Sequence, residues 1–171
     1  LFIQNIEGLA GSEKYFLQLI PKLIEKGIEV EFLSVYLDTK EQAYLDFQEL
    51  LDQNKIPSHH IKTSTYYSPF LFLKLLTFFR KNKYTIVHSH LIYADFWMAT
   101  LKRFGFLRNT KTISTLHGYQ EKIYVAYCLT PEKLPNNLYY KVAKNTYKYI
   151  DHVYACSYGL KNFYDKSGIK F

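Results

Sequence analysis

The sequence predicts one doubly wound α/β domain with a mostly parallel, Rossmann-like sheet. Strand-like and helix-like patterns alternate along the chain, which is typical of βαβ units. The length of 171 residues is that of one ordinary domain, and no repeat, low-complexity tract or Gly/Ser linker interrupts the alternation. We therefore expect residues 1–171 to form a single domain.

The N-terminal part begins with a strand at residues 1–5 and a helix at residues 12–27. Gly27 follows the helix as a stop signal, and Pro21 lies inside it and should kink it. One helical stripe carries the apolar side chains of Tyr15, Phe16, Leu19, Ile20, Leu23 and Ile24.

The next three elements are a strand at residues 29–36, a helix at residues 40–54 and a short strand at residues 57–64. The side chains that we expect to point inward from this helix are Leu45, Leu50 and Leu51.

Residues 69–83 form a helical pattern with a wide apolar face and a basic end. A helix in this position must cover the sheet, and we favour that interpretation, with Lys74, Thr77 and Lys81 facing outward. The same pattern is typical of helices that dock on anionic membrane surfaces, so peripheral membrane contact stays open.

The rest of the chain continues the alternation. We expect strands at residues 85–89, 110–116 and 152–156, and helices at residues 94–104, at residues 136–149 and from Tyr158 onward.

Composition narrows the classes of partner. The net charge is +7 and the lysines are scattered, which suits an anionic ligand, while no zinc finger, basic zipper or RNA-binding aromatic signature favours nucleic acid. The sequence contains no run of eighteen apolar residues that would span a bilayer.

Cys128 and Cys156 lack the spacing of a disulfide framework or thiolate zinc site, so a reducing cytoplasm fits best. Both ends of the sequence resemble the interior of a longer chain.

Ligands of such sheets bind beyond the carboxyl ends of the strands, so the loops there are the candidate sites. The first loop holds Gly8 and Gly11 and leads to Ser12, where a helix N-terminus can receive phosphate. Equally, the glycines could satisfy turn geometry while Ser12 caps the helix.

Histidines mark two further strand ends. His88 and His90 share one face of a strand, but the sequence offers no further ligands for a metal, and we expect one packed histidine and one loop-end contact. His117, followed by Gly118, can exchange a proton, donate to a phosphate oxygen or bind a sugar hydroxyl, and we favour such a role over packing. Ser157 is interpreted as a helix cap.

Together these segments resemble the N-terminal domain of family four (group 1) retaining glycosyltransferases, which have the two-domain GT-B fold. The segments that carry the resemblance are Gly11-Ser12-Glu13, Gly27-Ile28-Glu29-Val30, Ile86-Val87-His88-Ser89-His90, Thr115-Leu116-His117-Gly118 and Asp151-His152-Val153 through Ser157. Ala10 stands where the family often has the first of two adjacent glycines.

The resemblance implies a role for each matched position. Gly11 and Ser12 would give backbone donors to the diphosphate of a UDP- or GDP-linked sugar, and Glu13 would cap or orient the first helix. His117 would face the reacting sugar, without a metal or another cofactor. The acceptor pocket would be lined by His90, Gly118, Tyr119, Glu121 and Lys122.

The resemblance also implies a partner domain. A C-terminal domain, absent from this chain, would hold most of the nucleotide-sugar donor, so the fragment alone should be inactive. The acceptor would be a saccharide or a lipid-linked sugar in envelope or surface polysaccharide synthesis, in the cytoplasm or at the inner face of the membrane. A non-catalytic nucleotide- or sugar-binding module and a sugar-nucleotide epimerase of related fold remain alternatives.

Overall fold

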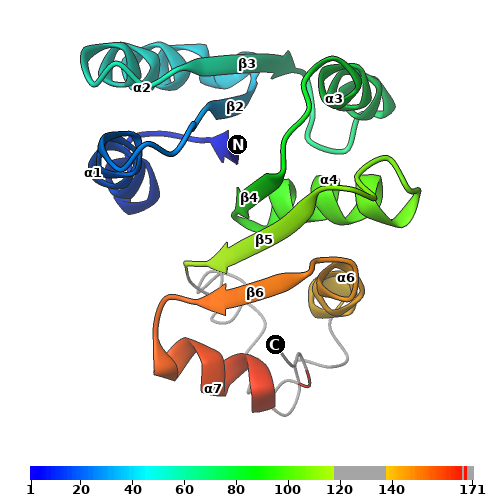
Figure 1. The fold of residues 1–171 in the computed structure, drawn as a ribbon. Helices are drawn as coiled ribbons and strands as arrows, with labels where there is room; N and C mark the ends of the chain where they lie inside the picture. The colour runs from blue at the N-terminus through cyan, green and yellow to red at the C-terminus, as the bar shows by residue number, and fades with distance from the viewer. Residues whose placement is uncertain (118–137, 167, 169–171) are drawn as a thin grey trace. The chain divides into compact units, whose positions relative to one another are not determined.

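The computed structural model describes residues 1–117, 138–166 and 168, with the backbone alone at 138–140. The strands in these residues form one six-stranded sheet in the order β3-β2-β1-β4-β5-β6 (Figure 1). This is the strand order of a doubly wound Rossmann-like sheet, so the predicted fold class is confirmed. The chain divides into two compact units, Leu1–His88 and Ser89–Phe171, which are described in turn.

The first unit contains three parallel strands and the start of a fourth. In the register of β1, β2 and β3, Phe2 pairs with Phe32 and Phe32 with Ser58. Figure 1 shows α1 and α2 on one face of these strands and α3 on the other. The elements are β1 (Phe2–Ile6), α1 (Gly11–Glu25), β2 (Phe32–Leu37), a 3-10 turn (Asp38–Lys40), α2 (Glu41–Gln53), β3 (Ser58–Thr63), α3 (Pro69–Lys81) and β4 (Ile86–His90).

A line of aromatic rings joins α1, β2 and α2. The ring of Phe32 lies 4.8 Å from that of Phe16 and 5.3 Å from that of Phe47, both edge to face, and all three side chains are fully buried. Such pairs add about 0.5–1.5 kcal/mol each beyond the burial of apolar area. The aromatic line therefore fixes how both helices sit on the strand between them.

The predicted inward face of α2 is partly wrong. Leu45 is 50% exposed, while Tyr44 and Phe47 are buried together with the correctly predicted Leu51. Residues 44, 47 and 51 follow the i, i+3, i+7 spacing of one helical face, and position 45 lies about 100° away from position 44. The stacked ring of Tyr36, 4.1 Å from that of Tyr44, explains why an aromatic side chain is buried there.

Helix α1 is close to its predicted range. Phe16 and Ile20 are fully buried, but Tyr15 and Ile24 at the edges of the predicted stripe are exposed. The helix continues through Pro21. Gly27 has a φ of +80° just after the helix, so it is the stop that the sequence predicts.

Helix α3 covers the sheet, as predicted. Leu71, Leu75 and Phe79 are buried, whereas Lys74, Thr77 and Lys81 are exposed. In the part of the chain that the structure describes, no helix is long and apolar enough to cross a bilayer.

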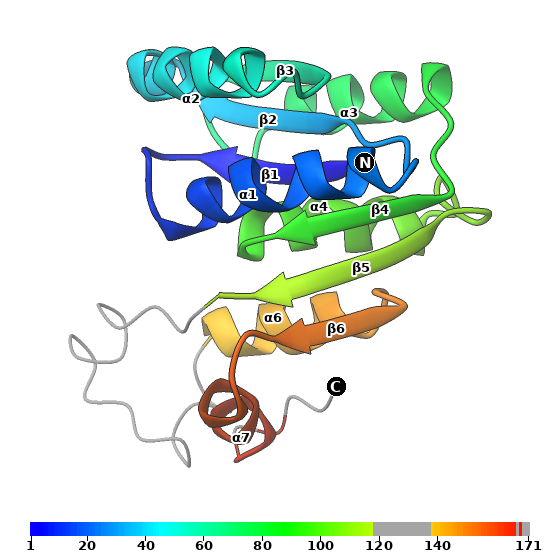
Figure 2. The same cartoon turned by 60° about the vertical axis from the view of Figure 1, so that its left-hand side comes forward.

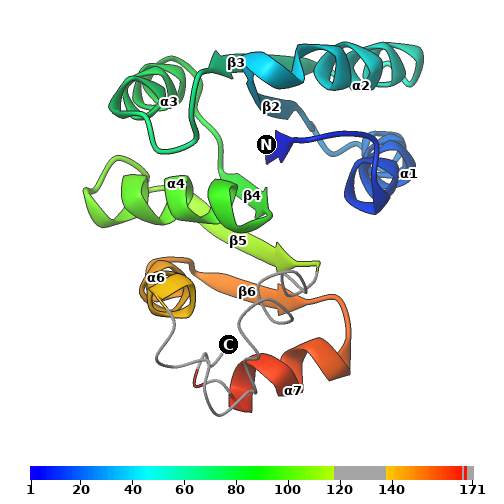
Figure 3. The same ribbon diagram turned by 180° about the vertical axis from the view of Figure 1, so that it is seen from behind.

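The second unit continues the alternation. Helices α6 and α7 lie on opposite sides of β6, as the two opposed views in Figures 1 and 3 show, and the arrows of β5 and β6 point the same way in Figure 2. The Ser157 hydroxyl accepts a hydrogen bond from the N–H of Leu160 at 3.1 Å, which confirms its role as a helix cap. The elements are α4 (Ile92–Arg103), β5 (Lys111–Leu116), α6 (Leu138–Tyr147), β6 (His152–Ala155) and α7 (Tyr158–Lys166).

Candidate functional site

The loop after β1 is the first candidate, because the strand order reverses next to β1 and ligands of open parallel sheets bind at such a reversal. This loop ends at Ala10, which has an extended backbone (φ −112°, ψ −165°) and precedes α1. Neither Gly8 nor Gly11 has a positive φ, so neither glycine is needed for turn geometry. A Cβ atom at Gly11 would meet nothing within 4 Å. The turn explanation therefore does not account for Gly11, which is an open position with an ordinary backbone.

Glu13, not Ser12, caps the first turn of α1. The Glu13 carboxylate accepts hydrogen bonds from the backbone N–H of Ala10 and from the Ser12 hydroxyl, both at 3.0 Å. Helix N-termini leave their first N–H groups without helical acceptors. Within the described residues the Glu13 carboxylate accepts the N–H of Ala10, and the N–H groups of Gly11 and Ser12 have no acceptor there.

A buried amide supports this turn from β1. Gln4, fully buried, donates through Nε2 to the Glu13 carboxylate and to the Ser12 hydroxyl. Glu13 itself is only 2% exposed. Its carboxylate thus lies beneath the helix N-terminus, where the helix dipole stabilises negative charge. Sequence reasoning missed Gln4, because a glutamine inside a strand gives no signal of its partners.

Polar oxygens at the end of β1 lack partners in the described residues. The side-chain oxygens of Gln4 and Asn5 are buried and have no hydrogen-bond donor there. Orphaned polar atoms of this kind are rare in folded proteins and are commonly completed by water or by a ligand. The carboxyl end of β1 is therefore a polar, incompletely satisfied surface.

The second candidate lies in the second unit, where two strands end in histidines. Nδ1 of His90, the last residue of β4, lies 2.5 Å from Nε2 of His117, which directly follows β5. The ring centroids are 4.8 Å apart. His90 has no exposed surface, whereas His117 is partly exposed. His90, which the resemblance assigns to the acceptor pocket, thus contacts His117 in this structure.

A buried carboxylate supports the end of β4. Asp95 in the first turn of α4 accepts hydrogen bonds from the Ser89 hydroxyl at 2.6 Å and from the Tyr147 hydroxyl at 3.3 Å. Burial raises the pKa of Asp95 to about 7, although the hydrogen bonds act in the opposite direction. Sequence patterns do not single out Asp95, since an Asp in the first turn of a helix is commonly solvent-exposed.

Other expected site residues have different places. Gly118, Tyr119, Glu121 and Lys122, and also Cys128, lie outside the described residues. His88 is partly buried with its ring 5.1 Å from that of Phe2, so both histidines of β4 pack against another ring. Among the residues that the structure describes, no three His, Cys, Asp or Glu side chains gather to hold a metal ion.

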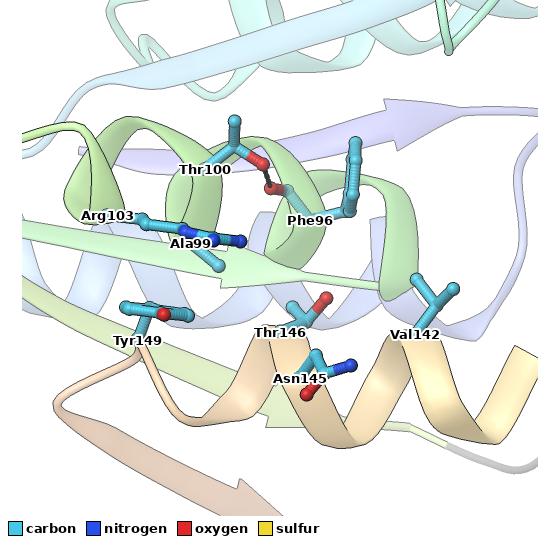
Figure 4. Close-up of a pocket in the computed structure, with 8 residues that line it drawn as sticks. All are labelled: Phe96, Ala99, Thr100, Arg103, Val142, Asn145, Thr146 and Tyr149. Atoms are coloured by element: carbon cyan, nitrogen blue, oxygen red, sulfur yellow. Dashed lines mark hydrogen bonds between the residues drawn. The ribbon is translucent and has the colours of Figure 1, made fainter.

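The described residues also form hollows away from these strand ends. One of about 180 Å³ between α4 and α6 has Arg103 stacked over Tyr149, 5.4 Å from its ring centroid (Figure 4). It is smaller than the roughly 300–1,000 Å³ typical of ligand pockets. A larger one of about 590 Å³ lies in the first unit by Leu1, Glu31 and Ile86, at the amino ends of β1 and β4. Ligands of this fold bind at the opposite end, so neither hollow is the candidate site.

Comparison with known proteins decides the family. The model of Glycosyltransferase Family 4 matches residues 9–170. The chain belongs to this family. The match spans the loop before α1, both histidine-bearing strand ends and β6, which are the segments that carry the resemblance in the sequence.

Solved structures show the fold of this family 4 domain. It is similar to the crystal structure of Anabaena Alr3699/HepE in complex with UDP, with a TM-score of 0.61, 14% identity, and coverage of 98% of this chain and 40% of that one. A second structure of the same protein, with UDP and glucose, gives a TM-score of 0.57 and 14% identity. It covers all of this chain and 43% of that one. The chain thus spans less than half of these proteins, and no curated protein matches it.

Proposed function

We propose that this family 4 domain is the acceptor-side half of a glycosyltransferase that moves a sugar from a nucleoside diphosphate to a saccharide or lipid-linked acceptor, with retention of anomeric configuration. The observation that carries the proposal is the family match over residues 9–170. The chemistry of the two candidate sites supports it in the following ways.

The N-terminus of α1 would bind the donor diphosphate. Gly11 and Ser12 would donate through their backbone N–H groups, and the open space at Gly11 would let a phosphate oxygen reach the chain. The Ser12 hydroxyl donates its hydrogen bond to the buried Glu13 carboxylate. Ser12 would therefore bind the diphosphate through its backbone N–H rather than its side chain. Binding of this kind stabilises the charge that develops on the leaving diphosphate.

His117 would act at the reacting sugar. An imidazole there can donate to a sugar hydroxyl or to an oxyanion, and it is the partly exposed member of the histidine pair. The residues that follow it in the sequence, Gly118, Tyr119, Glu121 and Lys122, would line the acceptor site. The domain would need no metal, because positioning and charge stabilisation by protein groups supply the catalysis.

A second domain would supply the remainder of the donor site. The similar Anabaena structure was solved with UDP, so we propose a UDP-linked sugar as the first donor to test, with GDP-linked sugars next. The 171-residue chain alone would be inactive, because it lacks that domain's contacts to the diphosphate. Synthesis of an envelope or surface polysaccharide is the proposed pathway class.

Helix α3 would hold the enzyme at the cytoplasmic face of a membrane. Phe70 and Leu73 are 74% and 55% exposed on the same side as Lys74 and Lys81. Apolar side chains beside cations are the combination that binds anionic lipid surfaces. A lipid-linked acceptor would then lie in the same membrane.

Turnover of the full-length protein tests the proposal. Nucleotide release would be measured against a panel of UDP- and GDP-linked sugars, for the wild type and for His117→Ala. Release by the wild type, with loss of about 10²-fold or more in a folded His117→Ala variant, is the expected result. Binding without release would instead support a binding module, and a changed sugar on an intact nucleotide would support an epimerase.

A further inference from the structure

We infer that His90 is a positioning residue that fixes the ring orientation and the tautomer of His117. This inference rests on the proposed function for its effect on turnover, but the pairing itself can be tested without activity. It starts from the 2.5 Å separation between Nδ1 of His90 and Nε2 of His117.

A hydrogen bond between two imidazole nitrogens requires one N–H and one lone pair. The facing nitrogens of His90 and His117 therefore share a single proton between them. Because Nε2 of His117 faces His90, Nδ1 is the ring nitrogen through which His117 would have to act on a sugar. If His90 donates, neutral His117 carries its proton on Nδ1 and is a donor at that atom, so the partner decides what His117 offers a substrate.

His90 is suited to this role because it is held rigidly. It has no exposed surface and ends β4 next to Ser89, whose hydroxyl bonds to the Asp95 carboxylate and to the carbonyl of Ile113 on β5. These contacts attach the end of β4 to α4 and to the strand that carries His117. Because His90 is fixed by these contacts, it can hold the ring of His117 in one orientation, and little side-chain freedom is lost when a substrate binds.

The backbone beside His90 is strained. Leu91 has φ 69° and ψ 152°, a conformation that is otherwise nearly confined to glycine and that costs about 1–3 kcal/mol. Strain of this kind persists where the surrounding structure holds it in place, and it is found preferentially at functional sites. Here the strained turn lets β4 end at His90 and α4 begin immediately at Ile92.

Two amide variants of His90 distinguish its hydrogen bond to His117 from the simple occupancy of its buried site. An asparagine places its amide near the position of Nδ1 and can bond to His117, whereas a glutamine places its amide near the position of Nε2. His90→Asn, His90→Gln and His90→Phe would be compared in the full-length protein. His152→Gln is the control, because His152 is an exposed histidine on β6.

Kinetics give the first readout. We expect His90→Gln and His90→Phe to lower kcat about 10–100-fold with the donor KM changed less than about 3-fold, the size typical of residues that orient a catalytic ligand. His90→Asn should recover at least about 10-fold relative to His90→Gln. Equal kcat in the Asn and Gln variants would overturn the inference.

The second readout does not need turnover. With selectively ¹⁵N-labelled histidine, the ring nitrogen shifts of His117 report its tautomer, and folding is checked by the remaining histidine signals. We expect the His117 shifts to move in folded His90→Gln and to stay near wild type in His90→Asn and His152→Gln. If they stay unchanged in His90→Gln, the inference fails. If the pairing is seen but no donor turns over, only the proposed function fails.

Discussion

The Glu13 carboxylate lies 3.0 Å from the backbone N of Ala10, three residues earlier, and accepts its hydrogen bond. The same carboxylate accepts from the buried Gln4 amide, so one side chain joins the start of α1 to β1. This junction shapes the helix N-terminus that we propose as the diphosphate site.

Replacing Glu13 by Ala should destabilise the protein by about 1–2 kcal/mol, because a cap is lost and a buried amide donor loses its acceptor. Chemical unfolding of the full-length protein measures this loss. Glu49→Ala, an exposed glutamate on α2, is the matched control and should change stability by less than about 0.5 kcal/mol. Equal losses in both variants would mean that the junction contributes nothing.

Asp95 should make the protein less stable as the pH rises. Its folded pKa of about 7 lies above its ordinary value of 3.8, so the folded state holds the proton more tightly than the unfolded state. The stability that this proton provides is complete below about pH 4, is lost between about pH 4 and 7, and changes at about 1.4 kcal/mol per pH unit between these limits. Asp95→Asn keeps an acceptor for Ser89 and should remove this slope.

Unfolding free energies at several pH values between 4 and 8 check the prediction for Asp95. The difference between the wild type and Asp95→Asn should grow in favour of the variant as the pH rises through this range. Asp46→Asn, an exposed aspartate on α2, serves as the control. A difference that stays constant from pH 4 to 8 would contradict the prediction.

Asp151 should act in the opposite direction and at lower pH. Burial favours its neutral form, but the Lys102 ammonium at 2.8 Å and the Thr112 N–H and hydroxyl outweigh burial and lower its pKa to about 2. The folded pKa is depressed, so its stabilisation is present above about pH 4 and is lost as the pH falls toward 2. Because solvent screens this exposed carboxylate, we expect it to be worth about 1 kcal/mol at neutral pH.

Acid unfolding of the wild type and of Asp151→Asn tests this account. The variant should be less stable at pH 6 and should lose less stability between pH 4 and 2. Asp165→Asn removes the exposed pair of Lys161 and Asp165, also at 2.8 Å, and should cost less than about 0.5 kcal/mol. Identical acid profiles for wild type and Asp151→Asn would show that the pKa of Asp151 is not depressed.

The exposed face of α3 predicts binding to anionic vesicles. Replacing Phe70 and Leu73 together by Glu should lower co-sedimentation of the full-length protein with anionic vesicles at least about 10-fold, because it removes apolar area and adds repulsive charge. Leu45→Glu is a matched control, since Leu45 is 50% exposed on α2. Equal binding by all three proteins, or binding to neutral vesicles alone, would count against membrane contact through α3.

The sequence predicted the fold class and every strand and α-helix in the described residues, though not the 3-10 turn at Asp38–Lys40, because alternating patterns and stop signals such as Gly27 are local. It did not predict the inward face of α2, since a stripe chosen by hydrophobicity favours Leu45 over Tyr44, and the stacking partner Tyr36 is known only from the strand register. The pairing of His90 with His117 is likewise invisible, because it joins residues 27 positions apart through the alignment of two strands.

Gly11→Val tests the central claim most directly. The open space at Gly11 and its ordinary backbone predict that valine is tolerated, with stability changed by less than about 1 kcal/mol, while its side chain obstructs a bound diphosphate. Gly8→Val, at another open position of the same loop, is the control. In the full-length protein we expect folded Gly11→Val to lose at least about 10² in kcat/KM for its nucleotide sugar, and Gly8→Val to lose much less. Wild-type donor affinity and turnover in folded Gly11→Val would contradict the account.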